Sequence, residues 1–158
     1  MNATQVRTAG PEDVVTLVAL MAEFYAESGF SLAAAPATRT FERLIGDPAL
    51  GQVWLMEHDG QPAGYVVLTV SFSMEYGGLR GFVDDLFVRP ACRRRGLGTA
   101  ALAEVKRACA VRGVRALLVE AGPDNDRALG VYRRSGFEDS RRLLLTLPLA
   151  APVHADED

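Results

Sequence analysis

Apolar side chains in the first part of the chain recur at the spacing of a helix. The members of this stripe, three or four residues apart or adjacent, are Val14, Leu17, Val18, Met21, Phe24 and Tyr25. Because one face of a helix repeats at this interval, the stripe predicts a helix that opens near Pro11 and ends at Gly29. A short strand over residues 5–8 is expected before it, and a loop over 30–36 and a second helix over 38–45 after it.

The middle of the chain consists of apolar runs that are separated by turn residues. Strands are predicted over residues 53–57, 63–72 and 79–88. Asp59-Gly60 lies between the first two runs, and this pair favours a type I′ hairpin because both turn positions need a positive φ. Gly77-Gly78 separates the second run from the third. The three strands are therefore expected to form an antiparallel meander.

The last third of the chain alternates helical and strand patterns. An apolar stripe predicts a helix over residues 96–112, and Gly113 ends it. The strand predicted over 114–119 is reached through this helix, so it should lie parallel to the strand before it. A further helix is expected after Asn125, and residues 137–147 are predicted to return as one long or two short strands.

Length and charge limit the class of protein. The 158 residues suit one domain, which we expect over residues 1–148, with a short acidic tail over 149–158 that is disordered. The net charge of −3 argues against a nucleic-acid binder.

Compartment and metal content follow from what the sequence contains. The N-terminus is polar and carries no signal-peptide pattern, and no apolar run reaches the ~20 residues that a membrane span needs. The two cysteines, Cys92 and Cys109, are too few for a disulfide framework and have no metal-ligand spacing. We therefore expect a cytoplasmic protein without a metal.

The segment over residues 82–99 carries the most informative motif. Pro90 ends an apolar strand because proline cannot donate to a strand ladder. Gly96 and Gly98 leave the main chain accessible just where a helix begins. The first N–H groups of a helix are unpaired and its dipole is positive there, which suits a phosphate. The arginines over residues 93–95 add positive charge.

Two aspartates interrupt the apolar strand that precedes this loop. A buried and unpaired charge is unfavourable, so these residues need an explanation. By strand alternation, Asp84 shares a face with Leu86, whereas Asp85 shares the other with Val83 and Phe87. A carboxylate here could accept a proton from a substrate, or it could simply form a salt bridge.

Three linked features together resemble the GCN5-related N-acetyltransferase (GNAT) family over roughly residues 53–147. They are the run from Asp84 to Pro90, the loop Arg93-x-x-Gly96-x-Gly98 at a helix start, and the series Asn125…Ala128…Tyr132…Gly136-Phe137. The resemblance implies a single-domain α/β (α+β) fold. Its central sheet would be mixed and mostly antiparallel, splayed at two parallel strands, with helices on both faces. One position departs from the pattern, because Arg94 stands where many members have glycine.

The resemblance also implies which residues bind acetyl-CoA. The diphosphate would lie on the main-chain N–H groups of Arg94, Arg95, Gly96, Leu97, Gly98 and Thr99, with one or two of the arginines Arg93, Arg94 and Arg95 on the phosphates. The pantetheine arm would pair with Phe87 and Val88. Asn125 would contact the same arm, and Tyr132 would lie close to the sulfur.

Aminolysis of a thioester needs a neutral amine, a stabilised oxyanion and a protonated leaving thiolate. The Val88 N–H is the family's expected donor to the thioester carbonyl. The Tyr132 hydroxyl, with a pKa near ~10, can protonate the thiolate. Asp84 is preferred as the base because related members carry an acid there, and Asp85 is the second choice. Two plainer interpretations stay open: Tyr132 as a packing residue and Asn125 as a helix cap.

The sequence thus predicts an acetyl-CoA-dependent N-acetyltransferase in which a primary amine attacks the thioester directly. No acyl-enzyme is expected, since no Cys or Ser is paired with a base. The resemblance favours a small polyamine-like amine, while a protein or peptide amine and an aminoglycoside-like amine remain alternatives. A non-catalytic acyl-CoA sensor is the main rival, and a homodimer is left open.

Overall fold

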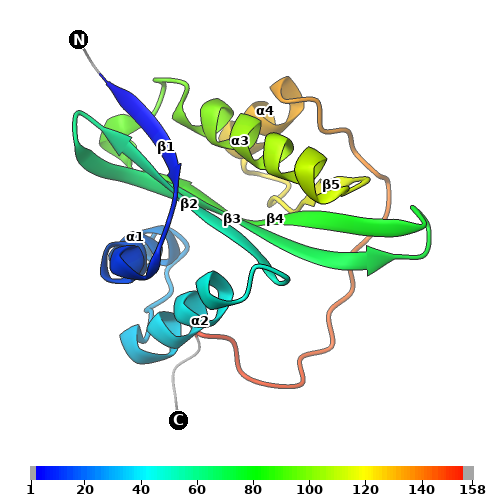
Figure 1. Ribbon diagram of the computed structural model, residues 1–158, viewed down its shortest axis with the longest axis horizontal. Helices are drawn as coiled ribbons and strands as arrows, with labels where there is room; N and C mark the ends of the chain where they lie inside the picture. Colours follow the sequence, from blue (N-terminus) through cyan, green and yellow to red (C-terminus); the bar gives the residue numbers. More distant parts are fainter. Residues whose placement is uncertain (1–2, 155–158) are drawn as a thin grey trace.

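The computed structural model describes residues 3–154 and is built on a five-stranded sheet with helices on both faces (Figure 1). The strands, in sheet order, are β1 (Thr4–Thr8), β2 (Gly51–His58), β3 (Gln61–Ser73), β4 (Gly78–Val88) and β5 (Leu117–Val119). Neighbouring strands are antiparallel, except that β4 and β5 are parallel. The mixed sheet confirms the predicted fold class.

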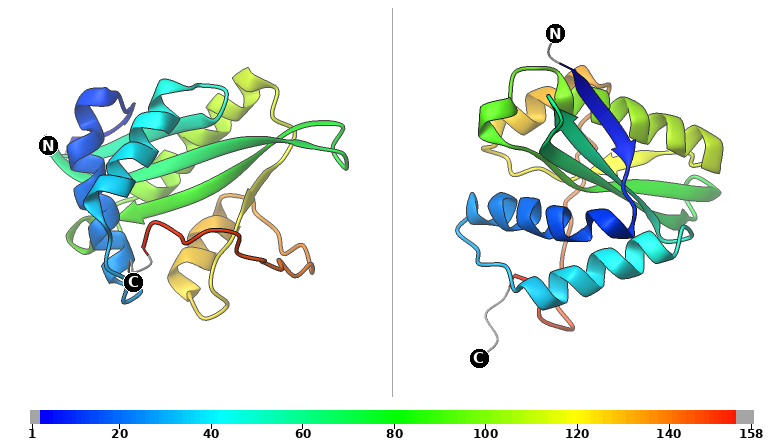
Figure 2. Two further views of the ribbon diagram at one scale, coloured as in Figure 1. Left: turned by 90° about the horizontal axis from the view of Figure 1, so that it is seen from below. Right: turned by 60° about the vertical axis from the view of Figure 1, so that its left-hand side comes forward.

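Four α-helices cover the sheet in two layers (Figure 2). They are α1 (Val14–Ala26) and α2 (Ala34–Gly46) on one face, and α3 (Leu97–Arg112) and α4 (Asp126–Arg134) on the other. Short 3₁₀ turns over Pro11–Asp13 and Pro90–Cys92 precede α1 and the α3 loop. None of the helices within residues 3–154 is long and apolar enough to cross a membrane.

Strand β3 is apolar on both faces because each face packs against a different helix layer. Tyr65 and Val67 belong to the core under α1 and α2, whereas Val66 and Leu68 belong to the core under α3. The predicted meander of β2, β3 and β4 is present. Its first turn has φ of 51° at Asp59 and 75° at Gly60, as a type I′ turn requires.

The parallel pair β4 and β5 is short and then diverges. Residues Gly81, Phe82 and Val83 pair with Leu117, Leu118 and Val119, in that order. Strand β5 ends there, while β4 continues to Val88. The last residues of β4 therefore leave one side of their backbone without a strand partner, which is the predicted splay.

A β-bulge in β4 changes which side chains share a face. The register between β3 and β4 shifts so that Val67 pairs with Asp85 and Leu68 with Val83, leaving Asp84 as the extra residue. The alternation expected across this point was therefore wrong for Val83, which packs in the core under α3, while Phe87 packs under α1. A bulge reverses alternation, and no local pattern announces it.

The predicted strands over residues 137–147 are absent, and this prediction was wrong. After α4 the chain passes the β3–β4 hairpin, where Arg142 forms an ion pair with Glu75, and continues as an open loop (Figure 2). A strand needs a partner backbone, and this segment meets none here. Helix α2 also begins at Ala34, earlier than predicted, because Ala34 and Ala35, which were expected to lie in the preceding loop, are good helix formers.

The predicted disordered tail is described only in part. Val153 packs against the core under α1 and α2, and the ring of His154 lies 5.3 Å from that of Tyr25. Residues 155–158 lie outside the described part of the chain.

The close approach of β3 to the end of β4 predicts the effect of one added methyl group. Gly64 pairs with Val88, and a Cβ at position 64 would lie 2.1 Å from the Phe87 carbonyl oxygen. Gly64→Ala should therefore lower the free energy of unfolding by about 1–3 kcal/mol, since β4 must move away. Urea denaturation measures this. Gly46→Ala is the control, because a Cβ at Gly46 meets no atom within 4 Å. Equal stability of the two variants would show that β4 accommodates a methyl group at position 64 without an energetic cost.

Candidate functional site

A cleft of about 940 Å³ opens where β4 leaves β5. Its walls come from the end of β4, the loop before α3, the first turn of α3, one side of α4 and the end of α1. Ten residues predicted to bind the cofactor line it together: Phe87, Val88, Arg93, Arg94, Gly96, Leu97, Gly98, Thr99, Asn125 and Tyr132. Arg95, the remaining predicted residue, is exposed and does not line the cleft.

The loop before α3 enters the helix through a residue in the left-handed conformation. Gly96 is the residue before the helix and has a φ of 79°. The N–H groups of Leu97, Gly98 and Thr99 follow at the start of α3, where a helix leaves its donors unpaired. A Cβ at Gly98 would face Val131 of α4 at 3.5 Å, so the bare backbone here opens toward the cleft.

The same loop explains the unusual position of Arg94. Its φ is 64°, in the left-handed region that glycine adopts without strain. An arginine there is disfavoured by about 1 kcal/mol. The glycine that many family members carry at this position therefore suits the left-handed backbone conformation. Arg94 adopts the same backbone conformation, and its side chain is exposed.

Arg93 is held by its own chain. Its Nε donates to the Val88 carbonyl oxygen at 2.9 Å, and its guanidinium pairs with the carboxylate of Glu27, just after α1. Arg127 of α4 lies 3.9 Å from the same carboxylate. Glu27 thus places a negative charge between two cationic side chains in the cleft, and no local pattern in the sequence indicates this arrangement.

Tyr132 and Asn125 are the two polar side chains that the sequence predicted on or before α4. Tyr132 is buried, and this burial, with the nearby charge of Asp85, raises the pKa of its hydroxyl to about 12. The hydroxyl therefore stays protonated at neutral pH. Asn125 caps α4, because its Oδ1 accepts the Ala128 N–H at 3.2 Å. The capping interpretation of Asn125 is confirmed, and the residue also lines the cleft.

The two aspartates of β4 have different surroundings. Asp85 accepts a hydrogen bond from the Tyr65 hydroxyl at 2.9 Å. Burial raises the pKa of Asp85 to about 7, against the lowering effect of Tyr65, and the charge of Asp84 adds to the rise. Asp84, the bulge residue, is exposed, yet the surrounding chain desolvates its carboxyl enough to raise its pKa as well.

Tyrosines surround this acidic pair. Tyr25 of α1 is half-buried, and burial together with Asp85 and Asp84 raises the pKa of its hydroxyl. Phe24, beside it, lies 5.4 Å ring to ring from Phe87 and also lines the cleft. In the sequence, Tyr65 is one residue of an apolar strand, whereas Phe24 and Tyr25 belong to a helical stripe that was expected to be mostly core, with its far end as a wall of the acceptor pocket. Among residues 3–154, no three His, Cys, Asp or Glu side chains are arranged to hold a metal ion.

Solved structures with the same fold extend across nearly the whole chain. An integron cassette protein, HFX_CASS3, from the mobile metagenome of Cole Harbour Salt Marsh is 56% identical, with a TM-score of 0.89 over 96% of this chain and 94% of that one. A predicted acetyltransferase from Clostridium acetobutylicum, solved with acetyl-CoA, is 18% identical, with a TM-score of 0.78 over 92% of this chain and 96% of that one. The aminoglycoside N-acetyltransferase AAC(6')-Iy, solved with CoA, is 16% identical, with a TM-score of 0.82 over 95% and 97%.

The last two likenesses concern the fold alone, because their sequence identities are low. The sequence evidence comes from a family model, that of the acetyltransferase (GNAT) family, which matches residues 17–137. This range contains most of α1, the strands from β2 to β5, the glycine loop and α4. The chain therefore belongs to the acetyltransferase (GNAT) family.

Proposed function

We propose that this acetyltransferase moves an acetyl group from acetyl-CoA to a small, cationic primary amine, which attacks the thioester directly. One observation carries the proposal: the glycine loop and a protonated tyrosine line one cleft at the splayed end of β4, and Asp85, beside Asp84 and outside the lining of that cleft, is close enough to raise the pKa of this tyrosine. Acetyl-CoA supplies the activated acetyl thioester. The residues present fit such a molecule, because the cleft offers unpaired main-chain donors at the start of α3 and an open strand end.

The start of α3 would hold the diphosphate. The N–H groups of Leu97, Gly98 and Thr99 point from a positive helix end, and Arg93 and Arg127 lie nearby. The end of β4, at Phe87 and Val88, would pair with the pantetheine arm, and the Val88 N–H would polarise the carbonyl. Asn125 would use its amide NH₂ group, since its Oδ1 already caps α4.

Tyr132 would protonate the leaving thiolate. Its raised pKa keeps the proton on the hydroxyl at neutral pH, and burial among the cleft walls fixes its direction. A positioned acid of this kind contributes typically 10²–10⁴-fold to a rate.

Asp84 would accept the proton of the amine. The bulge exposes its side chain, so a substrate can reach it, whereas Asp85 is engaged with Tyr65. Asp85 would instead supply negative charge beside the base. Two carboxyls next to each other attract a cationic amine, which supports a small polyamine-like acceptor.

Three alternatives remain, two for the acceptor and one for the activity. An aminoglycoside-like amine is supported by the fold shared with AAC(6')-Iy, and a peptide or protein amine by the exposure of Asp84. A non-catalytic acyl-CoA sensor would need the glycine loop but neither Asp84 nor Tyr132.

An amine screen tests the proposed activity. Thiol release from acetyl-CoA should appear with polyamines and exceed that with amino acids, peptides and aminoglycosides. Asp84→Asn and Tyr132→Phe should each lower kcat at least tenfold, with CoA affinity unchanged. Glu104→Gln, on α3 and paired with Arg107, is the control and should leave kcat unaltered. Tight CoA binding without release for any amine would support the sensor instead.

The phosphate assignment has its own test. Gly98→Val should raise the Kd for CoA at least tenfold, because the branched side chain fills the space between the first turn of α3 and Val131. Isothermal titration calorimetry measures the Kd, and circular dichroism checks the fold. Gly46→Val, far from the cleft, should bind CoA like the wild type. An unchanged Kd in Gly98→Val would remove the loop from the proposal.

The charge of Asp85 depends on its tyrosine partner. Tyr65→Phe removes a hydrogen bond to the charged carboxylate, which is worth about 1.5 kcal/mol, so the pKa of Asp85 should rise above 7 by about one pH unit. Because Asp85 is charged above its pKa, any activity that depends on this charge should shift to higher pH. Carbon-13 NMR titration of the carboxyl groups gives the pKa.

Tyr25→Phe is the matched control for this titration, since within the described residues the Tyr25 hydroxyl makes no hydrogen bond to Asp85. Its Asp85 pKa should stay near 7. An equal pKa in wild type and Tyr65→Phe would mean that burial alone sets the ionisation of Asp85.

A further inference from the structure

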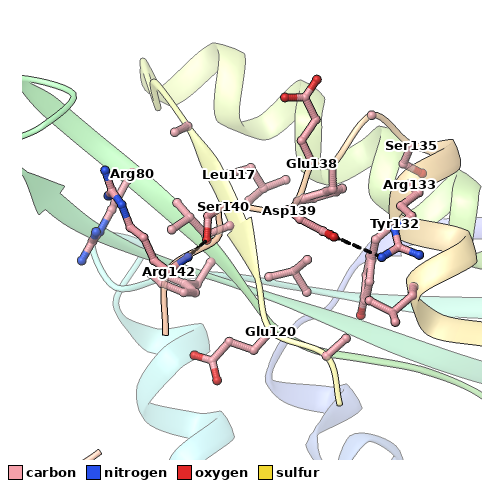
Figure 3. Close-up of a pocket in the computed structure, with 18 of the residues that line it drawn as sticks. Arg80, Leu117, Glu120, Tyr132, Arg133, Ser135, Glu138, Asp139, Ser140 and Arg142 are labelled. Carbon is pink, nitrogen blue, oxygen red and sulfur yellow. Dashed lines mark hydrogen bonds and ion pairs between the residues drawn. The ribbon is translucent and has the colours of Figure 1, made fainter. Parts of the chain in front are cut away.

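The groove along β5 and the cofactor cleft both contain ion pairs, but these pairs have different surroundings. In the groove, of about 1040 Å³, Arg133 of α4 pairs with Asp139, six residues further along the chain (Figure 3). That pair lies within one short turn of the chain. In the cofactor cleft, by contrast, Glu27 and Arg93 are 66 residues apart, and their pair brings the end of α1 to the loop before α3.

The Glu27 carboxylate lies between two cations that line the cofactor cleft. One of its oxygens is 2.5 Å from the guanidinium of Arg93, in the loop before α3. Its other oxygen is 3.9 Å from the guanidinium of Arg127, in the first turn of α4. All three side chains belong to the lining of the cleft. Three segments that are far apart in the sequence therefore meet at one carboxylate.

Arg93 keeps hydrogen-bond donors free although it is held from two sides. Its Nε donates to the Val88 carbonyl oxygen at 2.9 Å, and one of its terminal nitrogens donates to Glu27. A guanidinium has five N–H donors, so these two contacts leave others for an anion in the cleft. The attraction between Arg93 and such an anion is therefore limited by the charge of Glu27, and not by a lack of donors.

The charge of Glu27 has opposite effects in the empty and in the occupied cleft. Between Arg93 and Arg127, the carboxylate reduces the repulsion of two cations and cancels half of their charge. A diphosphate at the same place would be attracted by the arginines and repelled by the carboxylate. A group that stabilises the free protein but not the complex weakens binding, because a ligand responds to the difference between the two states.

The other charged side chains of the cleft are not engaged in this way. Arg94, Asp126 and Arg134 also belong to its lining, and none of them forms an ion pair within residues 3–154. Among the described residues of the lining, a carboxylate that is paired with the arginines is therefore a property of Glu27.

We propose that Glu27 is an internal anion of the diphosphate site: it neutralises Arg93 and Arg127 in the empty cleft and thereby lowers the affinity for CoA. When CoA binds, its diphosphate takes over the two arginines, and the Glu27 carboxylate moves toward solvent, to which 35% of the side chain is already exposed. When CoA leaves, Glu27 pairs with them again, which speeds release of this product. The inference rests on the proposed function, because it takes the loop before α3 as the diphosphate site.

Glu27→Gln tests the competition, because it removes the charge and keeps the size of the side chain. Isothermal titration calorimetry at low salt should give a Kd for CoA about fivefold lower than that of the wild type, the effect of one partly exposed ion pair. The difference should shrink as the salt concentration rises. Glu23→Gln is the matched control, since Glu23 lies one turn earlier on α1, pairs with Arg89 at 2.8 Å and does not line the cleft. It should bind CoA like the wild type.

Fragments of the cofactor locate the effect. Inorganic pyrophosphate carries the relevant charge and should bind Glu27→Gln more tightly than Glu23→Gln. Pantetheine has no phosphate and should bind both variants equally. Glu27→Asp keeps the charge on a side chain that is too short to reach both arginines, so its Kd for CoA should lie between those of the wild type and Glu27→Gln. Circular dichroism should show the wild-type fold for all three variants, because these side chains are partly exposed.

A Kd for CoA in Glu27→Gln that equals or exceeds the Kd in Glu23→Gln would overturn the inference, as would equal tightening of pantetheine. Failure of the underlying site gives a different result, because Gly98→Val would then leave the Kd for CoA unchanged, and the role of Glu27 would fall with the site. If Gly98→Val weakens CoA binding while Glu27→Gln does not strengthen it, the loop holds the diphosphate without competition from Glu27.

Discussion

The divergence of two parallel strands is the constraint on which the rest of this structure depends. Backbone donors and acceptors inside a protein need partners, and β5 supplies them to β4 only as far as Val83. Beyond that point, the last residues of β4 have an open edge that lies next to a helix start with its own open donors. Two adjacent sets of unpaired backbone groups therefore face a single cleft: the strand edge that the divergence of β4 and β5 leaves open, and the first N–H groups of α3.

Burial then shifts the pKa values of the titratable side chains near the same end of β4. The core under α1 and α2 reaches to the end of β4, where Tyr65 and Phe87 are buried. The bulge leaves the Asp84 side chain exposed, while Asp85 accepts a hydrogen bond from the Tyr65 hydroxyl. Burial moves the pKa of Asp85 toward neutrality and that of Tyr132 further above it. An acid that holds its proton and a carboxyl that titrates near neutral pH are thus obtained from ordinary side chains by position alone.

Elements and site features that depend on residues close together in the sequence could be predicted from the sequence. The Asp59-Gly60 turn, the Gly96 helix start and the Asn125 cap each depend on a few neighbouring residues, and each is present. Features that depend on distant partners were missed. The bulge at Asp84 arises from the register between two strands, and Glu27 reaches Arg93 only because α1 ends against the loop. Residues 137–147 show the same limit, since their strand pattern describes a preference that only a partner backbone can satisfy.

The ion pair between Glu27 and Arg93 connects the two halves of the site. Glu27 occupies, with its carboxylate, a position among cations that suits a phosphate, so an anion at the loop must compete for Arg93 and Arg127. Glu27 follows directly on the turn of α1 that carries Phe24 and Tyr25, which lie against Phe87 and near the aspartates. Replacement of Glu27 by a phosphate would remove one of two ion pairs that join the end of α1 to the loop, because Glu23 also pairs with Arg89 at 2.8 Å. The end of α1 would then be held by packing and by the Glu23–Arg89 ion pair, so under the proposed function the phosphate site and the acceptor site would be connected through α1.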